Sequence, residues 1–123
     1  MKKLALSLIL ATVAIACNGL NSKQQSAADK AIDSLEKLNA AVSVGAKLDE
    51  YHSLVIAAKA DVNSASAVLP AGELRKSLDA CILSYEIAEL DWKAMGRYAT
   101  SSALNGYWNI ARKNLKVARE LAN

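Results

Sequence analysis

The sequence predicts an all-α fold in which four helices form an up-down-up-down bundle over residues 22–123. Three observations lead to this fold class. Hydrophobic residues make up 53% of the chain, yet Phe is absent and Pro70 is the one proline, so the composition favours helices over strands. Apolar residues recur at alternating spacings of three and four. Turn-forming residues divide this pattern into four segments, as an antiparallel bundle requires.

The first expected helix covers residues 22–44. One face of this segment is apolar, and the opposite face carries charged residues such as Lys30 and Asp33. Gly45 follows directly and is expected to end the helix, because glycine accepts the left-handed conformation that commonly closes a helix. The expected core residues of this segment are Ala28, Ile32, Leu35, Leu38 or Asn39, and Val42.

The second expected helix covers residues 48–69 and has the most regular pattern. Asp49 and Glu50 fall in its first turn, where acidic side chains complement the helix dipole. Pro70 is expected to end it, because proline disfavours the helical conformation of the residue before it. Its expected core residues are Leu48, Tyr51, Val55, Ala58, Val62, Ala65 and Leu69.

The third expected helix covers residues 71–98 and the fourth covers residues 102–122. Thr100 and the two serines after it offer capping hydroxyls for the fourth helix. The expected core residues of the third are Leu74, Leu78, Cys81, Tyr85, Ala88, Trp92 and Met95. Those of the fourth are Leu104, Trp108, Ala111, Leu115, Ala118 and Ala122. A merger or rearrangement of these two helices, which gives a three-helix array or an oligomer, is the main alternative.

Three aromatic residues are expected at one level of the bundle. Folding the chain at its three turns brings Tyr51, Trp92 and Trp108 together, with His52 and Met95 nearby. Large side chains at one level of a bundle usually fill the core. The alternative is a small apolar pocket that contacts a ligand or partner through Tyr and Trp polar groups. The packed core is the favoured interpretation.

His52 is the one histidine of the chain. A haem iron held by His52 and Met95 is not expected, because the hairpin register separates them by about six residues, or roughly 9 Å along the axis. His52 is instead expected to meet Glu89 across the second and third helices. The chain has no Glu-x-x-His spacing, since Asp49 stands three residues before His52 without a matching second pair, and Cys81 lies on the core stripe. No metal, cofactor or catalytic residue is therefore expected, and the chain is not expected to be an enzyme.

The charge is nearly balanced outside the leader. Of the 15 Lys and Arg residues, Lys2 and Lys3 lie in the leader, which leaves 13 against 12 acidic residues. A nucleic-acid partner is not expected from such a balance. The fourth helix is nonetheless rich in basic residues. Lys113, Lys116 and Arg119 either form a solvated face or contact anionic lipid headgroups.

The N-terminal residues have the pattern of a signal peptide. Lys2 and Lys3 are followed by the apolar or small residues 4–16, a stretch that rises only about 20 Å as a helix and is too short to span a bilayer. The expected organisation is a signal peptide over residues 1–16, a tether over 17–21 and the bundle domain over 22–123.

The end of this segment, Ala14-Ile15-Ala16-Cys17, resembles the lipobox of bacterial lipoproteins, although that family prefers Leu or Val where this chain has Ala14. The resemblance implies cleavage before Cys17, acylation of its thiol and new amino group, and anchoring to a lipid bilayer. In a Gram-negative cell, Asn18 implies the outer membrane, with the domain facing the periplasm. Ordinary secretion to the periplasm stays open, because Ala14-Ile15-Ala16 is also a common cleavage site.

Together these features predict a small membrane-anchored lipoprotein of the cell envelope with a non-enzymatic accessory or protein-interaction role. The partner is expected to be another envelope protein, and self-association through the Ala-rich helices is also open. The alternative is a bundle that binds a small apolar ligand in the Tyr51, Trp92 and Trp108 layer. Anchoring at Cys17 is expected to place the turn at residues 69–72 and the end of the fourth helix near the membrane.

Overall fold

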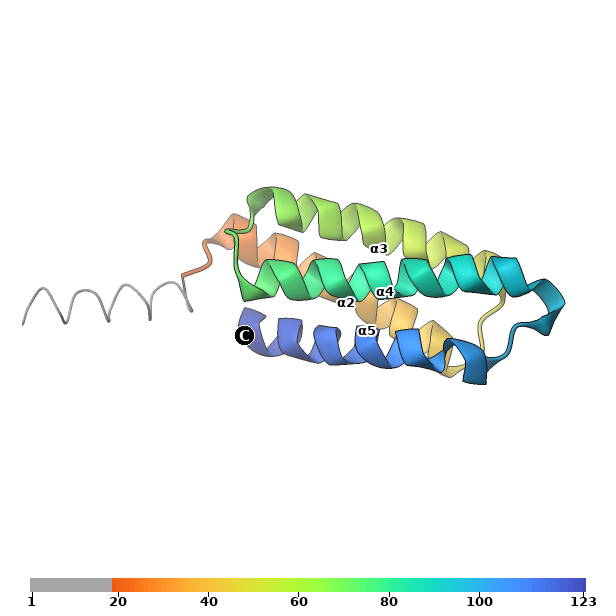
Figure 1. Cartoon of the computed structure of the whole chain (residues 1–123). Coiled ribbons are helices and arrows are strands. Elements are labelled where there is room, and N and C mark those ends of the chain that lie inside the picture. The colour runs from red at the N-terminus through yellow and green to blue at the C-terminus, as the bar shows by residue number, and fades with distance from the viewer. Residues whose placement is uncertain (1–18) are drawn as a thin grey trace, which may run out of the picture.

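A computed structural model describes residues 19–123, and Figure 1 shows a bundle of helices joined by short turns. The helices are α2 (Ser22–Ser43), α3 (Leu48–Val68), α4 (Glu73–Met95) and α5 (Ser101–Ala122), with a short 3-10 helix, η1 (Gly96–Tyr98), between α4 and α5. No strand occurs among these residues. The predicted all-α, up-down-up-down fold is confirmed. The expected signal peptide and Cys17 lie outside the described residues.

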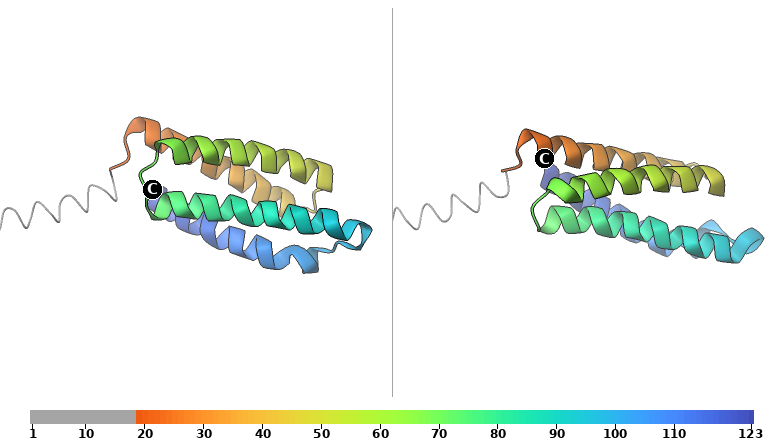
Figure 2. Two further views of the ribbon diagram at one scale, coloured as in Figure 1. Left: turned by 45° about the horizontal axis from the view of Figure 1, so that its top comes forward. Right: turned by 90° about the horizontal axis from the view of Figure 1, so that it is seen from above.

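Consecutive helices run antiparallel and pack around one core. The views in Figure 2 show α3 beside α4 and α5 beneath α4, so that α3 and α5 lie at opposite corners. The start of α2, the α3–α4 turn and the C-terminus share one end of the bundle (Figure 1). Two glutamine amides join these segments there: Gln24 donates to the Val68 carbonyl at 3.0 Å and Gln25 to the Ala122 carbonyl at 2.9 Å.

The ends of α2 and α3 follow from local chemistry. Asn21 caps α2 by accepting from the Gln24 backbone N–H at 2.8 Å, while the Gln24 side chain accepts from the Asn21 N–H. Gly45 has a φ of 78°, which supports its predicted role in ending this helix. Leu69 is extended, as expected of a residue before proline, and α3 therefore ends one residue earlier than predicted.

The third predicted helix, residues 71–98, is too long at both ends. Gly72 is extended, with φ 164° and ψ −169°, and α4 begins only at Glu73. At the other end Gly96 has φ 56° and ψ −126°, a combination open mainly to glycine, and the chain turns through η1 instead of continuing as an α-helix. Thr100 then caps α5 by accepting from the Ala103 N–H at 3.1 Å, as predicted, so α5 begins at Ser101.

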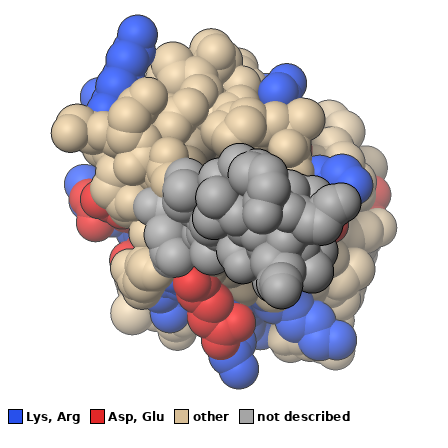
Figure 3. All heavy atoms as spheres, turned by 90° about the vertical axis from the view of Figure 1, so that its left-hand side faces the viewer, with Lys and Arg blue, Asp and Glu red and all other residues tan. Residues whose placement is uncertain are grey.

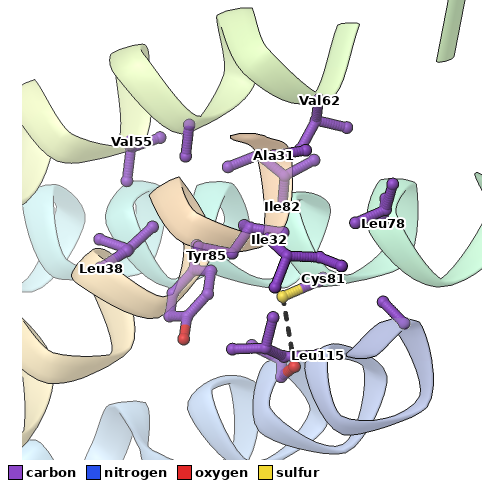
Figure 4. Packing of buried hydrophobic residues seen from close by; sticks show 14 of the residues in the cluster. Ala31, Ile32, Leu38, Val55, Val62, Leu78, Cys81, Ile82, Tyr85 and Leu115 are labelled. Atoms are coloured by element: carbon purple, nitrogen blue, oxygen red, sulfur yellow. Dashed lines mark hydrogen bonds between the residues drawn. The ribbon is translucent and has the colours of Figure 1, made fainter. Parts of the chain in front are cut away.

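The core runs the length of the bundle and receives side chains from all four helices (Figure 4). Leu78 and Cys81 of α4 are fully buried, as are Val62 of α3 and Leu38 of α2. The Cys81 thiol also donates to the Ala111 carbonyl of α5 at 3.2 Å, the contact drawn as a dashed line in Figure 4. The predicted apolar stripes therefore face the interior along most of their length, while the predicted core residues near the helix ends, such as Val42, Leu48 and Leu74, are half-buried.

Within residues 19–123, no helix combines enough length with enough apolar character to cross a bilayer.

Candidate functional site

The predicted aromatic layer forms at the end of the bundle where α3 begins. The Tyr51 ring lies 5.3 Å from the Trp92 ring and 6.2 Å from the Trp108 ring, measured between centroids, and the two indoles are 6.3 Å apart. These separations and the tilted or edge-on angles are those of favourable aromatic contact. Helices α3, α4 and α5 thus all contribute rings to a single cluster, in which the Tyr85 ring of α4 also meets Tyr51 edge-on at 6.4 Å.

The polar atoms of this layer are bonded to one another. The Trp108 Nε1–H donates to the Tyr51 hydroxyl at 3.2 Å, and that hydroxyl donates to the Tyr85 backbone carbonyl at 2.8 Å. Tyr51 is fully buried, and burial raises the pKa of its hydroxyl above the ordinary value. The hydroxyl is therefore held in its neutral form, in which it both donates and accepts.

These hydrogen bonds help to decide whether the aromatic layer is a ligand pocket or a packed end of the core. A ligand pocket needs polar groups that are free to orient a guest. The polar atoms of Tyr51 and Trp108 are already engaged with each other, while Trp92 and Met95 pack against the core from the last turns of α4. The observed contacts therefore match a packed end of the core.

His52 contacts Glu89 across the α3–α4 interface, as predicted from the hairpin register. Glu89 also accepts from the Lys93 ammonium at 3.0 Å, a contact that the sequence analysis did not include. The Glu89 side chain is only 9% exposed, whereas His52 and Lys93 are 45% and 48% exposed. A nearly buried carboxylate is thus compensated by two partners at the surface, which is how proteins usually tolerate such a group.

Two buried polar atoms have no hydrogen bond within the described residues, the hydroxyl of Tyr85 and the Oδ1 atom of Asn39. Tyr85 is fully buried, and burial raises the pKa of its hydroxyl. Figure 4 shows its ring between Leu38 of α2 and Leu115 of α5. Its place on the core stripe was predicted, but spacing alone carries no information about where a hydroxyl finds a partner.

Groups suited to metal binding or nucleophilic chemistry are not brought together in this part of the chain. Across residues 19–123, His, Cys, Asp and Glu side chains nowhere gather in threes that could hold a metal ion. Burial raises the pKa of the Cys81 thiol to about 12, so Cys81 is protonated near neutral pH. It behaves as a small core residue with one hydrogen bond.

The basic residues expected at a membrane surface have different surroundings. The Arg119 Nε donates to the Glu36 carboxylate of α2 at 2.7 Å, whereas Lys113 and Lys116 are exposed. Figure 3 looks onto the end of the bundle where α2 begins. Lys and Arg side chains lie around its visible rim with Asp and Glu between them, and they do not gather into one patch.

Comparison with known proteins gave no match: no protein-family model, curated protein or solved structure aligns with this chain. Its function has therefore to be inferred from its own residues.

Proposed function

We propose that this chain is a small lipid-anchored protein of the bacterial cell envelope, and that its bundle has a non-enzymatic accessory or protein-interaction role. The observation that carries the proposal is the sequence Ala14-Ile15-Ala16-Cys17, which ends an apolar segment and resembles a lipobox. Acyl chains on Cys17 would hold the domain at the membrane, and two or more of them give stable anchoring. With Asn18 after the cysteine, the outer membrane of a Gram-negative cell is the proposed site.

The position of α2 supports this proposal. The helix begins at Ser22, so the five residues from Cys17 to Asn21 reach at most about 17 Å when extended. An anchor at Cys17 therefore keeps the start of α2 close to lipid. The C-terminus and the α3–α4 turn share that end of the bundle (Figure 1).

The non-enzymatic part of the proposal is supported by the hydrogen bonds and ion pairs that the converging polar groups form with one another. The hydroxyl of Tyr51 bonds to Trp108 and Tyr85, and Glu89 bonds to His52 and Lys93. The Tyr51 bonds and the His52 contact join helix to helix, whereas the Lys93 contact lies within α4. The alternative of an apolar ligand in the aromatic layer has less support, since a guest would have to displace these contacts.

Metabolic labelling with an alkyne analogue of palmitate tests the proposal. The wild-type chain expressed in a bacterium should take up the label and fractionate with membranes, and the Cys17→Ser variant should do neither. Cys81→Ala is the matched control. If the label were carried by the buried Cys81 thiol, Cys81→Ala would lose the label and Cys17→Ser would keep it. Unlabelled wild-type protein recovered in the soluble periplasmic fraction would favour ordinary secretion.

A further inference from the structure

Helix α4 carries a second apolar stripe on the face that points away from the core. We call it the outer seam; it consists of Ala80, Leu83, Ile87, Leu90 and Ala94. Leu83 and Leu90 are 53% and 66% exposed, although they are large hydrophobic residues. The spacings of the outer seam alternate between three and four, the same rule that governs the core stripes. A helix that is apolar on both faces usually has a packing partner on each side.

The outer seam has sharp limits. The solvent face of α2 carries charged residues such as Lys37, whereas that of α5 mixes charged residues with the exposed Ile110, Val117 and Leu121. On α4 the next positions of the same spacing are Lys76 at one end and Arg97 at the other. The apolar stretch therefore covers 80–94, which rises roughly 21 Å along the helix. Charged residues at both ends define a contact surface of about four turns.

We propose that the outer seam packs against the outer seam of a second copy of this chain, with the two α4 helices antiparallel. In this register Leu83 lies opposite Ala94 of the second copy, and Ile87 lies opposite Leu90 of the second copy. Each of these contacts occurs twice, because the twofold axis crosses α4 midway between Ile87 and Leu90. Large residues then meet large ones at the centre, leucine meets alanine in the next layer, and Ala80 lies opposite Arg97 of the second copy.

Charge complementarity favours a second copy in this orientation. Residues that flank an apolar seam face each other across a helix pair and select the partner and its direction. In the antiparallel register, Glu86 lies opposite Lys93 of the second copy, and the reverse pair forms as well. In a parallel register, Glu86 would instead approach Asp91 of the second copy, and like charges at these positions disfavour pairing. The side chains of Glu86 and Lys93 are 32% and 48% exposed, and each already pairs within its own copy, Glu86 with Lys59 and Lys93 with Glu89. The pair between copies would form beside these contacts.

An exposed isoleucine of α3 lies at the level of the proposed axis. The ion pair between Lys59 and Glu86, at 3.2 Å, sets the register of α3 against α4. This register puts Ile56 level with Glu89, close to the centre of the outer seam. Ile56 is 56% exposed and would approach its own equivalent in the second copy.

A second exposed isoleucine lies at the same level on α5. The hydrogen bond from the Tyr107 hydroxyl to Asp91, at 2.6 Å, sets the register of α5 against α4 and puts Ile110 level with Ala88. Ile110 is 50% exposed. The exposed isoleucines of α3 and α5 therefore both flank the centre of the outer seam, where a twofold axis would bring each close to its copy.

The proposed pairing is independent of the lipid anchor and does not require acylation of Cys17. Disulfide trapping in intact envelopes tests it. Full-length chains that carry Leu83→Cys and Ala94→Cys are given different tags and coexpressed, and an oxidant is then added. We expect a disulfide-linked pair that carries both tags. The wild-type chain, treated in the same way, shows any product of the native cysteines.

Three results would overturn the proposal. Strong linkage of Leu83→Cys to itself would show a parallel pair or an antiparallel pair in another register, because in the proposed register the two equivalent residues lie far apart. Linkage to a different protein would show that the outer seam serves another partner. Absence of any linked product with either cysteine would show that the outer seam does not pair in the envelope.

A mass measurement gives an independent test. Leu90→Glu should raise the dissociation constant of the dimer by at least about 100-fold, because each copy loses a buried leucine and gains a charge. Val44→Glu is the matched control, since Val44 is 83% exposed and lies in the α2–α3 connection, outside the outer seam. Sedimentation equilibrium of the purified full-length chains should show Val44→Glu dimerising like wild type. Equal masses for wild type and Leu90→Glu at every concentration would overturn the proposal.

Discussion

The indole N–H of Trp108 donates to the hydroxyl of Tyr51 at 3.2 Å, and this bond joins α5 to α3 across the diagonal of the bundle. The same hydroxyl donates to the Tyr85 carbonyl of α4 at 2.8 Å. Helices that hardly contact each other are thereby connected at one level. A bond of this kind restricts how the helices slide or rotate, which uniform apolar packing does poorly.

Two tyrosine-to-phenylalanine substitutions should have opposite outcomes. Tyr51→Phe removes a hydroxyl with two partners and leaves the buried Trp108 N–H unpaired, so we expect a loss of about 1–3 kcal/mol in the free energy of unfolding. Tyr85→Phe removes a buried hydroxyl that has no bond to the described residues, so we expect no loss or a gain of up to about 1 kcal/mol. Urea denaturation followed by circular dichroism measures both. Equal losses would contradict the proposed difference between the two hydroxyls.

Leucine-to-alanine substitutions test the position of the core. Leu78 is fully buried on α4, and Leu78→Ala should cost about 2–5 kcal/mol because it leaves a cavity. Leu121 of α5 is 40% exposed and lies outside the outer seam, so Leu121→Ala should cost well under half as much. Thermal and urea unfolding of the two variants give the comparison. A cost below about 0.5 kcal/mol for Leu78→Ala would show that the core stripe of α4 is misplaced.

Two glycine-to-alanine substitutions should differ in sign. Gly106 lies inside α5 with open space where a Cβ would be, so Gly106→Ala should stabilise the fold by about 0.5–1 kcal/mol. Gly96 has a φ of 56°, and Gly96→Ala should cost about 1–3 kcal/mol although nothing obstructs the added carbon. Unfolding midpoints measured under identical conditions would show the difference. A stabilising Gly96→Ala would contradict the turn geometry between α4 and η1.

Stability should fall at alkaline pH. Burial raises the pKa of Cys81 from its ordinary value of 9.0 to about 12, so the unfolded chain loses this proton first as the pH rises. The unfolded state then binds fewer protons than the folded state, and the free energy of unfolding falls by about 1.4 kcal/mol per pH unit from pH 9 upward. Buried Tyr51 and Tyr85 add to the decline above pH 10, because their pKa values are also raised from 10.0.

Urea unfolding at several pH values between 7 and 11 measures this decline. In Cys81→Ala the component that begins near pH 9 should be absent, while the tyrosine component remains. As a direct check, a thiol reagent at pH 8 should modify Cys81 in unfolded protein and leave folded protein unmodified. Rapid modification of the folded chain would show that Cys81 is accessible.

Much of the fold was predictable because amphipathic helices repeat one physical rule. Tyr51, Leu78 and Leu115 each lie on a stripe whose spacing places them in the core, and Thr100 and Gly45 mark helix ends by known backbone chemistry. The start and end of α4 were less predictable. Ala71 is compatible with a helix by itself, but the extended Gly72 separates it from the first turn at Glu73.

The sequence predicted which residues of the candidate site lie close together, but it did not predict most of the hydrogen bonds between them. Hairpin register placed Tyr51, Trp92 and Trp108 together and paired His52 with Glu89, since register depends only on residue counts. Bond partners depend on side-chain directions that spacing does not encode. The Lys93 contact to Glu89 is different, because it joins residues i and i+4 of α4 and the spacing of Glu and Lys on one helix does indicate such a pair.

The outer seam was missed for a different reason. A search for one apolar stripe per helix assigns α4 to the core through Leu78 and Tyr85 and treats the remaining apolar residues as background. Only the exposure of Leu83 and Leu90 separates the two stripes. From the sequence alone, a helix with two apolar stripes cannot be distinguished from a helix with one broad stripe. The distinction requires knowing which residues the neighbouring helices cover.

The start of α2 lies at one end of the bundle, and this position determines how a paired molecule can rest on a membrane. An antiparallel pair has its two anchors at opposite ends, separated by roughly 46 Å, because the twofold axis crosses α4 about 15 residues beyond its start at Glu73. One bilayer can hold both anchors only if the helices lie along its surface, whereas a single copy can stand upright. Pairing would therefore increase the area of membrane that each molecule covers. A fluorophore on Val44→Cys should be quenched more strongly by spin-labelled lipids in otherwise wild-type protein than in Leu90→Glu.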